Sequence, residues 1–179
     1  MAINNYLSII TLNMNGLNAP IKRHKIDEWI RKHDPHICCL QETHLRTKDL
    51  HRLKVKGGKQ IFQAHRQERK VGVAILISDK IDFQRRAIKR EPEGHFIILK
   101  GRIHQEDINI VNIYAPITGA QKYIEKILED FKKDIDSNTI IVGDFNTPLS
   151  KMNRSSKQNI YKDIVSLNNT QEEMDLTDI

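Results

Sequence analysis

The sequence predicts an α+β fold with β-sheets at its centre, and two features of its 179 residues lead to this expectation. Segments rich in isoleucine, valine and aromatic residues, which favour strands, recur along the whole chain. Helix-like segments separate some of these strands without alternating strictly with them, which argues against a doubly wound parallel sheet. Because no linker, repeat or low-complexity tract divides the chain, we expect one domain over residues 1–179.

Six segments have the composition of strands. In order they are LSIITLN (7–13), HICCLQ (36–41), VGVAILIS (71–78), HFIILKGRI (95–103), INIVNIYA (108–115) and TIIVGDF (139–145). The only two cysteines, Cys38 and Cys39, are adjacent in one of them. Alternation along a strand sends neighbouring side chains to opposite faces, so a bridge between these two would be strained. We expect both to be reduced thiols that pack in the interior.

Three segments have the pattern of amphipathic helices. The first follows Pro20, carries Ile26, Trp29 and Ile30 on one stripe, and ends before the Asp34-Pro35 dipeptide. The second runs from Thr118 to about residue 135, with apolar residues at helical spacing and Lys and Glu on the other side. The third is SKQNIYKDIVSLNN (156–169). These helices are expected to cover the sheets.

The charge balance favours a polyanionic partner. Lys and Arg number 29 against 23 Asp and Glu, which gives a formal net charge of +6. No apolar run reaches the roughly 20 residues that a membrane span needs. The apolar stretch near the start lacks a basic leader and a small-residue cleavage site. We therefore expect a soluble, unexported protein, located in the nucleus or the cytoplasm.

Polar side chains close four of the predicted strands. They are Asn13, Glu42, Tyr114 and, after the last strand, Asp144 with Asn146. A polar residue at a strand end is often only the start of a turn. Several together indicate a ligand site, because strand ends hold side chains rigidly while the loops stay open. Carboxylates with amides, a phenol and no thiolate suit Mg²⁺ or Mn²⁺, which usually serve phosphoryl chemistry.

Five motifs, in this order and at these separations, resemble the endonuclease/exonuclease/phosphatase superfamily. They are TLNMNGL, CCLQETHL, VGVAILIS, VNIYAP and GDFNTPLS. Outside them, IKRHKIDEWI, HRLKVKG and IYAPITGA are similar to the endonuclease domain of the second open reading frame protein of mammalian LINE retrotransposons. The resemblance covers essentially the whole chain.

The resemblance implies a four-layered α/β sandwich, with two packed sheets between helices, and a Mg²⁺-dependent DNA endonuclease that leaves a 3′ hydroxyl. By motif, Glu42 would be the principal metal ligand, with Asn13 and Asp144 also on the metal side. Asp144 would orient or deprotonate the attacking water. Tyr114 would hydrogen-bond the scissile phosphate, and Asn146 would steady the phosphate and its neighbours.

The family pattern continues past the end of this sequence with strands of the second sheet, a further metal-side Asp and a Ser-Asp-His motif. On that basis we expect a copy truncated at its C-terminal end, with attenuated catalysis, since grouped catalytic residues act as a unit. The alternatives are a catalytically inactive nucleic-acid-binding fragment of a retrotransposon or, less favoured, a phosphoesterase acting on small molecules or lipids. In the family the domain is fused to a reverse transcriptase; alone, a monomer is expected.

Basic clusters supply candidate DNA contacts. Lys54 and Lys56 lie in KVKGGK, Arg85 and Arg86 lie in RRAIKR, and Arg154 follows the last strand. Each cluster taken singly is about as well explained as a solvated charged face. If these residues contact phosphates, DNA binding should fall steeply with salt and depend little on sequence.

Overall fold

The computed structural model describes residues 6–45, 60–65, 71–147, 174 and 176–177. It divides into two compact units, which are described separately below. The first comprises Met1–Tyr114 and Asn138–Asp144, and the second comprises Ala115–Ser137 and Phe145–Ile179. All eight strands of the described residues belong to the first unit.

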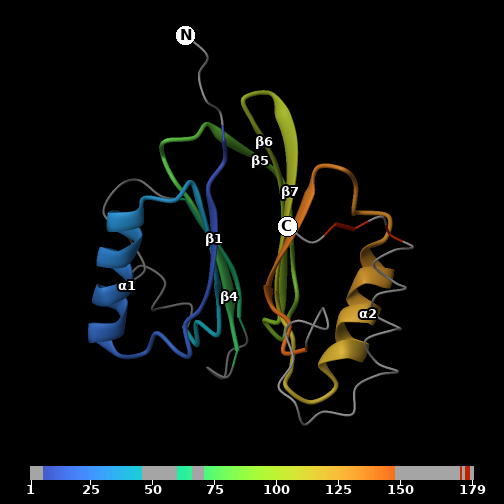
Figure 1. The fold of residues 1–179 in the computed structure, drawn as a ribbon, viewed down its shortest axis with the longest axis horizontal. Helices are drawn as coiled ribbons and strands as arrows, with labels where there is room; N and C mark the ends of the chain where they lie inside the picture. The colour runs from blue at the N-terminus through green and yellow to red at the C-terminus, as the bar shows by residue number, and fades with distance from the viewer. Residues whose placement is uncertain (1–5, 46–59, 66–70, 148–173, 175, 178–179) are drawn as a thin grey trace. The chain divides into compact units, whose positions relative to one another are not determined.

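The first sheet has the order β1-β2-β4-β3. Its strands are β1 (Ile9–Asn13), β2 (Ile37–Gln41), β3 (Gln60–Ala64) and β4 (Val73–Ile77). β1 and β2 are parallel and are joined by helix α1 (Pro20–His33), while the other pairs are antiparallel. Figure 1 shows α1 on one side of this sheet and the second sheet on the other. Pro20 at the first helical position and Asp34 in a left-handed conformation at the C-cap set the ends of α1.

The second sheet has the order β5-β6-β7-β8. Its strands are β5 (Phe83–Arg90), β6 (Phe96–Ile103), β7 (Glu106–Tyr114) and β8 (Thr139–Asp144). β7 and β8 are parallel, and the other two pairs are antiparallel. His104 and Gln105, with φ of 49° and 70°, make the two-residue turn between β6 and β7, as such hairpins require. Gly143 lies against Ile113 of β7, where a Cβ would come within 1.9 Å of the carbonyl oxygen.

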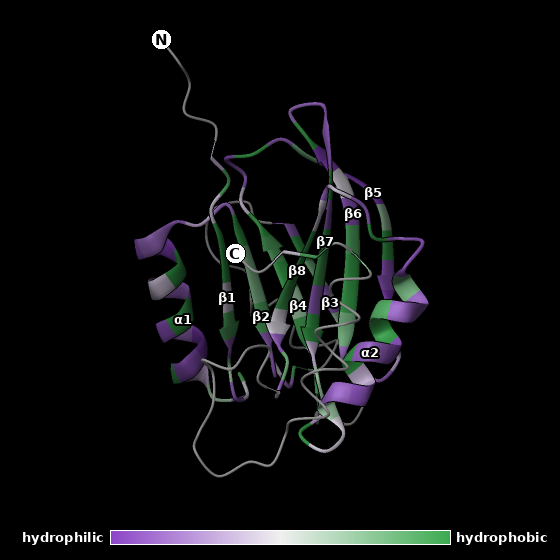
Figure 2. Cartoon of the chain, turned by 45° about the vertical axis from the view of Figure 1, so that its right-hand side comes forward, coloured by the Kyte–Doolittle hydropathy of each residue, from purple (hydrophilic) through white to green (hydrophobic). Residues whose placement is uncertain are grey.

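The two sheets pack face to face around a shared apolar core. Residues of both sheets, among them Ile37, Ile75, Ile97 and Ile110, are fully buried in one cluster. Figure 2 shows the contrast within the sheets, since β4 and β6 are largely green whereas β5 carries purple segments. A second cluster lies between α1 and the first sheet. Burial of apolar side chains on both faces of the first sheet stabilises this arrangement of layers.

A buried polar network crosses the sandwich. The side chain of Asn112 on β7 is completely buried, and its amide nitrogen donates to the carbonyl oxygens of Leu40 and Ala74, each at 3.0 Å, in the other sheet. Its amide oxygen accepts from Gln41 Nε2 at 2.6 Å, and the same nitrogen of Gln41 also donates to Thr11 Oγ1 at 2.9 Å. A satisfied polar network in an apolar core fixes one arrangement of its partners. This network therefore fixes the position of β7 relative to β2 and β4.

The second unit contains helix α2 (Ala120–Phe131). Its buried residues recur at helical spacing and form one stripe: Ala120, Ile124, Ile127, Leu128 and Phe131. Gly119 at its N-cap has a φ of 75°, a conformation that glycine adopts without strain.

The sequence-based fold class is confirmed, because the chain is an α+β sandwich of two packed sheets with helices. All six predicted strands and the first two helices are present, with α2 shorter than expected. Strands β3 and β5 were not predicted. Cys38 and Cys39 are free and buried, and they belong to different core clusters. The third predicted helix, 156–169, lies outside the described residues. No helix of the described chain has the length and apolar character of a membrane span.

Candidate active site

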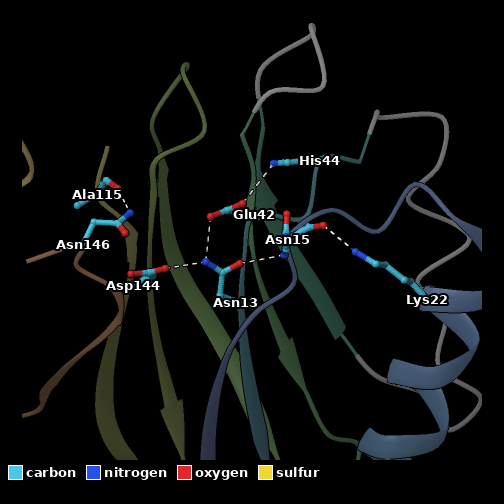
Figure 3. Close-up of polar contacts among 8 residues, drawn as sticks. All are labelled: Asn13, Asn15, Lys22, Glu42, His44, Ala115, Asp144 and Asn146. Atoms are coloured by element: carbon cyan, nitrogen blue, oxygen red, sulfur yellow. Dashed lines mark hydrogen bonds and ion pairs between the residues drawn. The ribbon is translucent and has the colours of Figure 1, made fainter. Parts of the chain in front are cut away.

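The predicted site residues Asn13, Glu42 and Asp144 meet at one end of the sandwich (Figure 3). Asn13 ends β1, Glu42 directly follows β2, and Asp144 ends β8 of the other sheet. The amide nitrogen of Asn13 donates to Glu42 Oε1 at 2.9 Å and to Asp144 Oδ2 at 2.6 Å. The two carboxylate oxygens are therefore at most two hydrogen-bond lengths apart. Glu42 and Asp144, which are far apart in the sequence, thus accept hydrogen bonds from the same amide group.

The orientation of the Asn13 amide follows from its other contact. Its Oδ1 accepts a hydrogen bond from the backbone N–H of Asn15 at 2.9 Å, so its NH₂ group must face the carboxylates. Asn13 was expected on the metal side of the site. In this structure its oxygen faces the backbone, and its nitrogen holds the carboxylates of Glu42 and Asp144 together.

The chain leaves β1 and β2 through an unusual backbone. Asn15, Glu42 and His44 have φ of 43°, 50° and 52°, a left-handed conformation that is costly for residues with a Cβ. The segments that follow β1 and β2 run side by side. Gly16 N–H donates to the Glu42 carbonyl oxygen at 2.8 Å, and Leu17 N–H donates to the Thr43 carbonyl oxygen at 2.9 Å. Strained backbone concentrates at functional sites, where the surrounding contacts hold it. These bonds provide such contacts for Glu42.

His44 is a site residue that the sequence analysis missed. Its Nε2 lies 3.8 Å from Glu42 Oε2, and its side chain is 24% exposed. Figure 3 marks this contact with a dashed line. A Cβ on Gly16 would come within 3.1 Å of its Nδ1, so the imidazole packs closely against the glycine. The signal was present in the QETH motif, in which an imidazole stands two residues after the acid.

The donor set of this site suits a hard divalent cation. Two carboxylates face the same point, and the group between them is a neutral amide. Carboxylate oxygens without thiolates are the ligands that Mg²⁺ and Mn²⁺ prefer. Among the described residues, no group of three or more His, Cys, Asp and Glu side chains is arranged to hold a metal. Any cation here would thus depend on Glu42 and Asp144, with solvent or substrate oxygens completing its shell.

Tyr114 lies beside Asp144, because the two residues are partners in the register of β7 and β8. Tyr114 as a whole residue is 9% exposed and belongs to the core cluster between the sheets, and its ring is parallel to that of His95, with ring centroids 5.9 Å apart. His95 Nδ1 is 2.9 Å from the Tyr114 carbonyl oxygen, and Tyr114 N–H donates to the His95 carbonyl at 2.7 Å. His95, also missed from the sequence, therefore packs along the tyrosine that was expected to contact phosphate.

The remaining predicted residues lie elsewhere. Asn146 belongs to the second unit, where its amide nitrogen donates to the Ala115 carbonyl at 2.7 Å. Arg85 and Arg86 are exposed on β5, in the half of the strand remote from the site. Arg86 Nη1 lies 3.5 Å from Asp107 Oδ1, near the start of β7. The other predicted DNA contacts, Lys54, Lys56 and Arg154, are outside the described residues.

Comparison with known proteins agrees with this architecture. A family model described as the Endonuclease/Exonuclease/phosphatase family matches residues 10–175. The transposon TX1 uncharacterized 149 kDa protein of Xenopus laevis is 30% identical over 173 residues, which cover 89% of this chain and 13% of that protein. The chain thus spans a small part of that relative.

Solved structures show the same fold. The endonuclease domain of TRAS1, a telomere-specific non-LTR retrotransposon, superposes with a TM-score of 0.66 at 16% identity, over 94% of this chain and 71% of that one. A functionally unknown conserved protein from Enterococcus faecalis V583 gives a TM-score of 0.65 at 17% identity, over 89% and 72% of the two chains. At these identities the likeness concerns the fold alone.

Proposed function

Since the chain belongs to the endonuclease/exonuclease/phosphatase family, we propose that it is a divalent-metal-dependent endonuclease that nicks DNA. Family membership and the transposon-related similarities support a nuclease or phosphoesterase activity. Within that range, DNA is favoured by the net charge of +6 and by the likeness to the endonuclease domain of a retrotransposon. Nicking that leaves a 3′ hydroxyl, as target-primed retrotransposition needs, is part of the proposal.

One observation carries the proposal: Asn13 donates to both Glu42 and Asp144, each from a different sheet. Two carboxylates held this close repel each other, and a neutral amide offsets only part of that repulsion. Structure alone would not require such a pair at the exposed end of a sandwich. A site for a divalent cation beside a phosphodiester gives such a pair a role, because the cation neutralises the two charges.

The side chains divide the work as follows. Glu42 and Asp144 would hold Mg²⁺ or Mn²⁺, which when bound supplies charge stabilisation for the phosphate oxygens. Asp144 would orient the attacking water molecule, because a carboxylate accepts hydrogen bonds from water and can take up its proton. Asn13 keeps the two carboxylates at their separation. Tyr114, beside Asp144 in the register, would donate its phenol hydrogen to a non-bridging phosphate oxygen.

Nicking of supercoiled plasmid by the full chain tests the proposal. We expect relaxation that requires Mg²⁺ and is abolished by EDTA. Glu42→Gln and Asp144→Asn keep the shape of each side chain and remove its charge, so each should lower the rate by at least about 100-fold. Glu106→Gln is the matched control, because Glu106 is an exposed glutamate at the opposite end of β7 from Tyr114.

The control variant should nick at the rate of the unchanged chain. Retention of the plasmid without any nicking would instead identify a nucleic-acid-binding fragment. Nicking that survives both Glu42→Gln and Asp144→Asn would refute the assignment of the site. Metal affinity gives a second readout, since Mn²⁺ binding followed by electron paramagnetic resonance should weaken in the same two variants and not in Glu106→Gln.

A further inference from the structure

We call the end of the sandwich that carries Asn13, Glu42 and Asp144 the strand-end face. This face also includes the ends of β3 and β5, the edge strands on the other side of each sheet. β5 and β7 are each antiparallel to β6, so β5 runs parallel to β7 and ends at the same face. β3 likewise runs parallel to β2, because both are antiparallel to β4. Arg90, the last residue of β5, and His65, just after β3, therefore lie on the strand-end face.

A cavity of about 430 Å³ opens between these two strand ends. Its lining includes Ile61, Gln63, His65, Arg90, Glu91 and Pro92. Its volume is within the range of small-ligand sites. It is separate from the site at Glu42 and Asp144, neither of which is among its lining residues.

Arg90 is the positively charged residue that lines this cavity, and a hydrogen bond holds its side chain in place. Arg90 is exposed, yet its Nε donates to the Gln63 carbonyl oxygen at 2.7 Å, a bond that joins the edges of the two sheets. That bond leaves four further N–H groups of the guanidinium as donors at the cavity, which suits a planar, two-point contact with phosphate oxygens. Because the side chain is already anchored, less conformational entropy is lost on binding.

The other polar groups of the cavity fit an anion. Burial and the neighbouring Arg90 charge both lower the pKa of His65, so the imidazole is neutral at physiological pH and can act as a hydrogen-bond partner. Gln63 Nε2 lies 3.1 Å from His65 Nδ1 and orients the ring. Glu91, an acidic residue of the lining, accepts a hydrogen bond from the His95 N–H at 2.7 Å, which offsets part of its charge.

We propose that this cavity is a subsite in which Arg90 binds a backbone phosphate of the nucleic acid, away from the bond that is cut. The inference rests on the proposed function, since it assumes a nucleic acid lying across the strand-end face. β5 and β7 are separated by one strand, so Arg90 is about 10 Å from the end of β7. The bound phosphate is therefore a neighbour of the scissile phosphate and not the scissile phosphate itself.

This assignment separates Arg90 from the other arginines of β5. Arg85 pairs with Gly101, and Gly101 with Ile108, so Arg85 is level with the beginning of β7. Arg90 pairs with Ile97, and Ile97 with Asn112, near the end of β7 that carries Tyr114. Two arginines of one strand thus carry the same charge at different distances from the proposed path of the nucleic acid.

The experiment compares Arg90→Gln with Arg85→Gln in the full chain. Binding to a short DNA duplex is measured by fluorescence anisotropy in EDTA, where no cutting takes place, at several salt concentrations. For Arg90→Gln we expect binding several-fold weaker at low salt and a slope of log affinity against log salt reduced by about 0.9, the value for one lost phosphate contact. For Arg85→Gln we expect the slope of the unchanged chain.

Arg90→Lys keeps the positive charge but lacks the planar guanidinium that can contact two phosphate oxygens at once. It should therefore restore the salt slope of the unchanged chain while recovering only part of its affinity for DNA. Equal effects of Arg90→Gln and Arg85→Gln, or no change of slope in Arg90→Gln with native circular dichroism, would overturn the subsite. Plasmid nicking by the unchanged chain is scored separately. Nicking with Arg90-independent binding rejects the subsite alone, whereas Arg90-dependent binding without nicking rejects the proposed activity alone.

Discussion

Replacing Asn112 by leucine should remove much of the stability of the sandwich. The substitution keeps the approximate volume of the side chain and deletes its three hydrogen bonds, to Leu40, Ala74 and Gln41. Each buried group that loses its partner costs about 1–3 kcal/mol. Gln41 retains its bond to Thr11, and the added apolar burial of leucine compensates in part. We therefore expect a net loss of about 3–5 kcal/mol, a large part of the roughly 5–15 kcal/mol that stabilises a domain.

Urea unfolding, followed by the fluorescence of the single tryptophan, measures this loss. Trp29 lies on α1 and packs against the core cluster of the first sheet, so its emission reports on the first unit. Asn109→Leu is the matched control, because Asn109 is on the same strand but faces the other way, and its amide donates to Thr139 Oγ1 at 3.3 Å. The control should lose about 1 kcal/mol. A loss at Asn112 no larger than the loss at Asn109 would refute the reasoning.

Three further predictions concern single positions. Gly143→Ala would bring a Cβ within 1.9 Å of the Ile113 carbonyl oxygen and should destabilise the chain by about 3 kcal/mol or more in urea unfolding, whereas Gly119→Ala, where a Cβ meets nothing, should cost about 1 kcal/mol. Burial raises the pKa of the Cys39 thiol, so neither cysteine should react with a thiol reagent until the chain unfolds, and a fast reaction in the native state would contradict this. The pKa of His65, followed by NMR, should lie below its ordinary value of about 6.5 and rise only partly in Arg90→Gln, because burial is the larger cause of its depression. Full recovery of the His65 pKa in Arg90→Gln would show instead that the arginine charge is the larger cause. Because the imidazole of His65 binds a proton more readily in the unfolded chain than in the folded one, the free energy of unfolding should decrease as the pH falls below the ordinary pKa of histidine.

The sequence was most informative where a strand is buried on both faces. VAILI in β4, whose five residues are all buried, has a composition that fits little else. β5 was missed because FQRRAIKR carries four cations, and such a segment forms a strand only at a sheet edge, where its side chains reach solvent. β3 was missed because QIFQA is short and its two glutamines give no clear alternation.

For the site, the strand ends could be predicted, since Asn13, Glu42 and Asp144 each follow an apolar run. The direction of the Asn13 amide could not, because it depends on the backbone N–H of Asn15. The role of Arg90 was equally hidden among neighbouring cations, since only the register of β5 with β6 and of β6 with β7 shows which arginine reaches the strand-end face.

The left-handed backbone at Glu42 has a consequence for which amino acids the position accepts. At a φ of 50°, glycine, asparagine and aspartate preserve the path of the chain, whereas valine, isoleucine and threonine bring a branched Cβ against the carbonyl oxygen. Glycine there would discard the carboxylate and relax the turn at the same time, so chemistry and folding are affected in opposite directions. Loss of catalysis through a glycine at this residue can thus coexist with a gain in thermal resistance.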